Sequence, residues 1–193
     1  MRKNLGAKPY TYPQPVFILA AYAEDGTPDA MNAAWGGISD GEEISMCISS
    51  GHKTTKSLLA RGAFTVSMAD AAHVAECDYV GIVSGNKVPD KFARAGFHAV
   101  KSSFVDAPLI EELPIAVECE LKEYDHSTGR LVGKIVNVSV DERVLDASGN
   151  VDVALARPIT FDPFNNTYVV LGDVVIPDCP AVFAGCEAQF VKP

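Results

Sequence analysis

Two stretches of the sequence alternate between apolar and polar side chains, and this alternation constrains the fold more than any other feature. Within residues 115–124 the apolar side chains at 115, 117, 119 and 121 alternate with those at 116, 118, 120 and 122, and residues 131–140 repeat the pattern with valines at 136, 138 and 140 on one face. A period of two places successive side chains on opposite faces of a β-strand. Turn-forming residues occupy 125–129 between them. The sequence therefore predicts two long antiparallel strands joined by a hairpin.

Shorter apolar runs separated by turn signals make up much of the rest of the chain, which is typical of a β-rich fold. Asp-Gly pairs at 25–26 and 40–41 predict hairpin turns. Gly62 follows a run of good helix formers and is expected to end a helix. We expect strands at about 16–22, up to about Trp35, at about 43–49, 64–68 and 168–171, and helices at about 54–61 and 70–80. The expected fold class is mainly β with appended helices, a decorated β-barrel, in a single domain over residues 1–193.

The charge balance restricts the partners. Sixteen Lys and Arg residues against 25 Asp and Glu give a formal net charge of 16 − 25 = -9. Nucleic acids and anionic membrane surfaces bind basic surfaces, so we expect neither as a partner. The longest apolar run, 16–23, is much shorter than the roughly 18 residues of a membrane helix. Any anion site on this chain must therefore be local.

Cysteines and the standard nucleotide motifs exclude several further classes. Five cysteines, an odd number with no C-x-x-C pair, indicate reduced thiols and a cytoplasmic protein. His73 and Cys77 would share a helix face, but no further ligands lie at zinc-like spacing, so we expect no metal site. The sequence lacks both G-x-G-x-x-G and G-x-x-x-x-G-K-[ST], which argues against Rossmann and P-loop nucleotide sites.

Three short segments, 32–37, 52–54 and 78–92, combine an aromatic ring, cations, hydroxyls and glycines. This combination suits a planar, phosphorylated ligand. Trp35 would cover a ring, Thr54 at a helix start would hold a phosphate, and Lys53 or Lys91 would neutralise its charge. Each residue also has a purely structural interpretation: Trp35 in the core, Thr54 as a helix N-cap, and Lys91 as a solvated charge.

The order and spacing of these segments resemble the flavin reductase-like domain family, and in particular flavoredoxin-like FMN-binding split-barrel proteins. The similarity covers nearly the whole chain. The motifs that carry it are Met31-Asn32-Ala33-Ala34-Trp35, His52-Lys53-Thr54, Asp78-Tyr79-x-Gly81-x-x-Ser84-Gly85, Asp90-Lys91-Phe92 and Tyr168-x-x-Leu171-Gly172.

This resemblance implies a split β-barrel that binds FMN non-covalently and forms a homodimer. It implies that residues 32–35 line the isoalloxazine ring and that residues near 49–57 hold the phosphate. The cofactor-binding residues it implies are Asn32, Ala33, Ala34, Trp35, Ser49, Ser50, His52, Lys53, Thr54, Ser57, Ser84, Gly85, Lys91, His126, Phe161 and Phe164.

Three departures from the family pattern qualify that set. The interval from His126 to Gly133 is longer than the family pattern, which puts the role of His126 in question. Phe161 and Phe164 both fit the position of a flavin-contacting phenylalanine, and the sequence does not choose between them. The tail over 175–186 contains prolines where the family has a simpler glycine-rich stretch.

The resemblance implies an enzyme: an FMN-dependent oxidoreductase that takes electrons from NAD(P)H or a redox protein and passes them on through the flavin. No catalytic side chain is required, because the cofactor carries the chemistry. Lys91 near the N1-C2 edge would stabilise the reduced, anionic flavin. One alternative is an FMN electron carrier that does not oxidise nicotinamide itself. Another is a split barrel that binds a different planar ligand such as haem through His52, His98 or His126.

Overall fold

The computed structural model describes residues 1–172 and contains one large antiparallel sheet. Its seven strands are hydrogen-bonded in the order β2-β1-β5-β8-β9-β4-β3. These strands are β1 (Phe17–Tyr22), β2 (Pro28–Ala33), β3 (Gly36–Asp40), β4 (Glu43–Cys47), β5 (Ala63–Met68), β8 (Ile115–Asp125) and β9 (Arg130–Val140). The smaller elements are β6 (Ala99–Lys101) paired with β7 (Pro108–Ile110), β10 (Ile159–Asp162) paired with β11 (Thr167–Val170), the helices α1 (Lys53–Arg61), α2 (Val74–Ile82), α3 (Lys91–Arg94) and α4 (Val153–Ala156), and a 3-10 turn (Glu142–Val144).

The predicted long hairpin is confirmed. β8 and β9 pair antiparallel from Ile115 opposite Val140 to Asp125 opposite Arg130, with two register shifts along the way. At the turn the Asp125 carboxylate accepts hydrogen bonds from the hydroxyls of Ser127 and Thr128, which lower its pKa to about 2. These bonds hold the reversal in the place that the sequence predicts.

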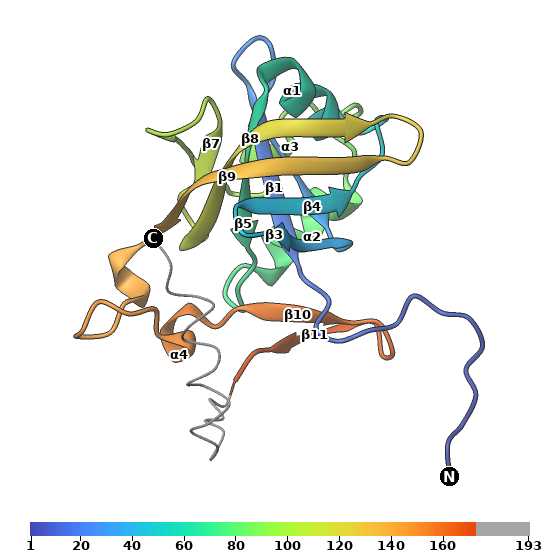
Figure 1. Ribbon diagram of the computed structural model, residues 1–193. Helices are drawn as coiled ribbons and strands as arrows, with labels where there is room; N and C mark the ends of the chain where they lie inside the picture. The colour runs from blue at the N-terminus through green and yellow to red at the C-terminus, as the bar shows by residue number, and fades with distance from the viewer. Residues whose placement is uncertain (173–193) are drawn as a thin grey trace.

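The sheet curls into a barrel that stays open between two of its strands. In Figure 1, β8, β9 and β4 cross over β1 and β5, so the sheet wraps around an interior. β2 and β3 follow one another in the chain, joined only by Ala34 and Trp35, yet they occupy opposite ends of the strand order. The barrel is therefore split where the chain passes from β2 to β3.

The sequence of β1 is apolar without alternation because both faces of this strand are buried. Leu19 and Ala21 belong to the cluster of buried side chains inside the barrel, which includes Phe64 and Leu58. Ile18 and Ala20 belong to a second cluster on the outer face, where α2, α3 and β7 cover the strand. A strand that is buried on both faces carries a continuous apolar run.

The structure corrects the expected elements in two places and confirms a third. The strand expected to reach Trp35 ends at Ala33, and a separate strand, β3, follows. The helix expected at 70–80 runs from Val74 to Ile82, because the Asp70 carboxylate accepts hydrogen bonds from the backbone amides of residues 72 and 73 and delays the helix start. The expected final strand is confirmed as β11, paired with β10.

Residues 175–186, where the sequence departs from the family pattern, lie outside the described residues, as do Cys179 and Cys186. Within residues 1–172, no helix is long and apolar enough to cross a membrane.

Candidate functional site

A cleft of about 560 Å3 opens where the barrel is split. Four parts of the chain form its walls: the segment before β1, the end of β2 with the β2–β3 connection, the segment from the end of β4 to the start of α1, and α2 with the β10–β11 hairpin. Pockets that bind small ligands are commonly of this size and mostly apolar. The lining residues are Gln14, Pro15, Val16, Met31, Asn32, Ala33, Ala34, Trp35, Cys47, Ile48, Ser49, His52, Asp78, Gly81, Ile82, Phe161 and Tyr168.

The β2–β3 connection places Asn32, Ala33, Ala34 and Trp35 in the wall of the cleft. The Cys47 backbone amide donates a hydrogen bond to the Trp35 carbonyl at 2.9 Å, which fixes the connection against β4. The Trp35 side chain is 63% exposed. The core interpretation of this residue is therefore wrong, and its ring is available to a ligand or a partner.

The loop after β4 joins the cleft to the start of α1. His52 is the N-cap residue of α1 and lines the cleft. No side chain caps this end of the helix, and its first turn contains no acidic residue. The first amides of a helix point outward and carry partial positive charge, so such an end favours an anion. Ser49 also lines the cleft, whereas Ser50 does not.

The Thr54 side chain performs a different task from either prediction. It is buried and donates a hydrogen bond from Oγ1 to Asp29 Oδ2 at 2.5 Å, so it is neither the N-cap nor free to bind a ligand. Ser57 is also buried in α1. Any contribution of these two residues to anion binding must come through the position of the helix.

Lys91 is buried behind the cleft wall, which corrects its interpretation as a solvated charge. Its side chain is 4% exposed, and Nζ donates hydrogen bonds to the carbonyls of Val80 at 3.0 Å and Val83 at 3.2 Å. Asp29 Oδ1 lies 4.0 Å from the same Nζ. Burial lowers the pKa of Lys91, while the neighbouring Asp29 raises it. Lys91 therefore caps the C-terminal end of α2.

Lys53 and Gly85 lie beside this buried pair, and neither they nor Ser84 line the cleft. Lys53 Nζ donates a hydrogen bond to the Pro89 carbonyl at 3.0 Å. A Cβ atom on Gly85 would lie 2.6 Å from Asp29 Oδ1 and 3.0 Å from Lys53 Cδ, so only glycine allows this approach. The predicted motifs thus come together in space, but as a layer that supports the cleft.

The two candidate phenylalanines lie in different surroundings. Phe161 lines the cleft, whereas Phe164 stacks on Tyr12 with ring centroids 5.4 Å apart and lies outside the lining. His126 packs edge-on against Tyr124, 4.9 Å between centroids, and is also outside it. Among the described residues, the structure brings only Phe161 of these three predicted contacts to the cleft.

Several lining residues were not predicted. Tyr168 donates a hydrogen bond to Asp78 Oδ1 at 2.8 Å, which ties the β10–β11 hairpin to α2 across the cleft. Burial raises the pKa of this tyrosine. Asp78 and Tyr168 both belong to motifs noted in the sequence, but the sequence assigns neither of them a role in the site.

An open β-barrel with a ligand-sized cleft at its split defines the class: the protein is a split-barrel protein with a site between its barrel and its appended elements. The chain belongs to the family described as the flavin reductase like domain, whose model matches residues 10–183.

Solved structures agree with this assignment. Flavoredoxin of Desulfovibrio vulgaris (Miyazaki F) is 36% identical with a TM-score of 0.87, and the match covers 94% of this chain and 100% of that one. Flavoredoxin from Methanosarcina acetivorans is 23% identical with a TM-score of 0.81, over 95% and 98% of the two chains. An FMN-binding protein from Thermus thermophilus with bound 1-cyclohex-2-enone is 20% identical with a TM-score of 0.71, over 92% and 100%. No curated protein sequence matches the chain.

Proposed function

We propose that the protein is an FMN-dependent oxidoreductase of the flavin reductase and flavoredoxin type, which moves electrons from NAD(P)H or a redox protein through non-covalently bound FMN. The observation that carries this proposal is the continuity of an apolar cleft with an uncapped helix N-terminus, since His52 belongs to both. A flat ring joined to a phosphate needs these two surroundings side by side. The family match over 10–183 supports a single domain.

The cleft residues fit the ring of FMN. Ala33, Ala34 and Phe161 offer apolar walls, and Trp35 offers an aromatic face at the mouth. Aromatic rings stack favourably in offset arrangements. Flavin supplies the two-electron chemistry when it is bound. The chain's own residues then need only to bind it, orient it and limit the access of water.

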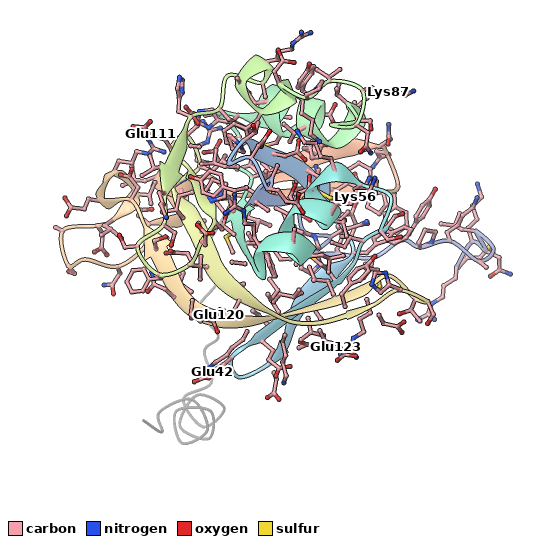
Figure 2. All side chains as sticks on the ribbon, turned by 90° about the horizontal axis from the view of Figure 1, so that it is seen from above. Glu42, Lys56, Lys87, Glu111, Glu120 and Glu123 are labelled. Carbon is pink, nitrogen blue, oxygen red and sulfur yellow. The ribbon has the colours of Figure 1, made fainter. Side chains whose placement is uncertain are left out.

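The phosphate site that we propose is the first turn of α1, with backbone amides as the main donors. Ser49, Ser50 and Lys53 are the side chains nearest in sequence to this turn. The surrounding charge supports the choice: Figure 2 places Lys56 and Lys87 on one side of the molecule and Glu42, Glu120 and Glu123 on another. Lys53 and Lys56 lie on this helix, and Glu24 and Asp25 are their acidic neighbours in an adjoining pocket. Thr54 and Ser57 act here by holding the helix in place.

Among the described residues, the positions of the histidines argue against the haem alternative. His52 lines the cleft, but His98 forms an ion pair with Glu112 at 2.6 Å and His126 packs on Tyr124. The three side chains therefore contact different parts of the fold and do not all line the cleft. A cytoplasmic location is our proposal from the cysteines: the three described ones, Cys47, Cys77 and Cys119, are free thiols.

The first test asks whether the purified protein contains a flavin and whether a nicotinamide reduces it. We expect the purified protein to show a two-banded flavin spectrum and to release FMN on acid treatment. Mixing the loaded protein with NADH or NADPH in a stopped-flow instrument should bleach the flavin within seconds. Bleaching by dithionite but by neither nicotinamide would support the electron-carrier alternative. A colourless protein that takes up no added FMN would contradict both.

We also propose a homodimer. Trp35 and Ile38 are 63% and 68% exposed beside the cleft, and β3 is an edge strand of the sheet. Exposed apolar side chains next to an unpaired strand edge are suited to a second copy of the chain.

Sedimentation equilibrium should give a mass of twice 20.5 kDa. Ile38→Glu should shift this mass toward the monomer, because a charge would be buried in the interface. Val151→Glu, at an exposed position of the 146–151 loop, is the control and should leave the mass unchanged. A wild-type protein that stays monomeric at all concentrations would disprove the dimer.

A further inference from the structure

Gln14 lies between the N-terminal segment and β1, and β10 fixes its backbone. Its amide N–H donates a hydrogen bond to Thr160 Oγ1 at 2.9 Å, and its carbonyl accepts from the same hydroxyl at 2.9 Å and from the Phe161 amide at 2.9 Å. The residue is only 6% exposed. With its main chain held on both sides, the side chain has a defined position at the cleft.

The side-chain carbonyl of Gln14 lacks a hydrogen-bond partner. Four buried side-chain atoms of the described residues share this property: Gln14 Oε1, Asp29 Oδ1, Thr55 Oγ1 and Ser67 Oγ. Of these four residues, Gln14 alone lines the cleft. Buried polar atoms almost always have a partner, because leaving one unpaired costs free energy. The missing partner of Gln14 is therefore expected from a molecule in the cleft.

We propose that the Gln14 amide recognises the imide edge of the flavin. The oxidised isoalloxazine ring has one N–H donor, N3–H, which lies between two carbonyl groups. A primary amide offers an acceptor and a donor side by side. Gln14 Oε1 can accept from N3–H while the amide nitrogen donates to the adjacent ring carbonyl. This inference rests on the proposed function, because it names one contact within the same site.

The position of Gln14 makes it a specificity residue as well. It also lines an adjoining cleft of about 480 Å3, whose wall includes Tyr10, Pro13 and Trp35. A planar ligand without an N–H donor at its edge would leave Oε1 buried and unpaired. The site should therefore discriminate between flavins that differ only at N3.

The experiment compares FMN with 3-methyl-FMN, which has a methyl group in place of the N3 hydrogen. Apoprotein is titrated with each flavin, and binding is followed by quenching of flavin fluorescence. We expect wild-type protein to bind FMN roughly fivefold more tightly, the size of one net hydrogen bond. Gln14→Met, which keeps the length but removes the amide, should bind both flavins equally and with the lower affinity.

Two further variants make the result specific. Gln14→Glu keeps an acceptor of the same length and should retain the preference for FMN. Asn150→Met removes an amide from an exposed loop and should behave as wild type. If Gln14→Met does not fold, equal binding of the two flavins by the wild type still overturns the role of Gln14.

The failures are distinguishable. A wild-type protein that binds neither flavin would overturn the proposed function. Equal binding of both flavins by the wild type, or an unchanged preference in Gln14→Met, would overturn the role of Gln14 and leave the proposed function standing.

Discussion

A Lys91→Met variant is expected to lose about 3–5 kcal/mol of unfolding free energy, the cost of removing one partner from a buried ion pair. Lys91 Nζ is the cation 4.0 Å from Asp29 Oδ1, an atom without a hydrogen-bond partner, and Asp29 is fully buried. Methionine fills a similar volume, so the loss comes from charge and hydrogen bonding. Urea unfolding, followed by intrinsic fluorescence, measures it.

The same substitution removes two hydrogen bonds from the end of α2. The carbonyls of Val80 and Val83 accept from Lys91 Nζ, and carbonyls at a helix C-terminus have no partner within the helix. Because Gly81 and Ile82 in this part of α2 line the cleft, the variant should also release FMN more readily. The effect on the flavin is indirect, since Lys91 is not part of the lining.

Two controls separate the buried pair from a general loss of charge. Lys87→Met removes an exposed lysine and should change stability by no more than about 0.5 kcal/mol. A double variant that adds Asp29→Asn to Lys91→Met removes the carboxylate that Lys91→Met leaves unpaired. This variant should recover part of the lost unfolding free energy. A Lys91→Met protein within about 1 kcal/mol of wild type would show that the pair contributes little.

The buried pair also illustrates what the sequence predicts well and what it does not. The motifs containing Gly85 and Lys91 are expected beside the flavin, and the structure places them around Asp29, outside the lining of the cleft. Their roles could not be derived from order alone. Whether a lysine is solvated or caps a helix depends on Asp29, which lies 62 residues earlier in the chain and whose pairing is set by the fold.

The strands also differ in how well the sequence predicts them. The long hairpin over 115–140 was predictable because its alternation and turn are local. β3 was missed because Gly36 and Gly37 have low strand propensity, and its pairing depends on β4. Trp35 occupies the break between β2 and β3, so its exposure follows from the open barrel and could not be derived from an apolar side chain alone.

Gly81→Ala is expected to have the second largest effect, about 2 kcal/mol in stability with a roughly 30-fold weaker affinity for FMN. A Cβ atom at this position would lie 2.8 Å from Asn32 Cβ, closer than two such atoms can approach. Asn32 Cβ is attached to the backbone of β2, so no side-chain rotation relieves the contact. Either α2 or β2 must move, and both form walls of the cleft.

Helix propensity works against this loss, which makes the direction of the result informative. Alanine within a helix is favoured over glycine by up to about 1 kcal/mol. If the contact with Asn32 were easily relieved, Gly81→Ala would stabilise the protein. Gly41→Ala, where an added Cβ would meet no atom within 4 Å, is the matched control and should leave FMN affinity unchanged. A Gly81→Ala protein that is more stable and binds FMN as wild type does would mean that the α2–β2 contact does not set the width of the cleft.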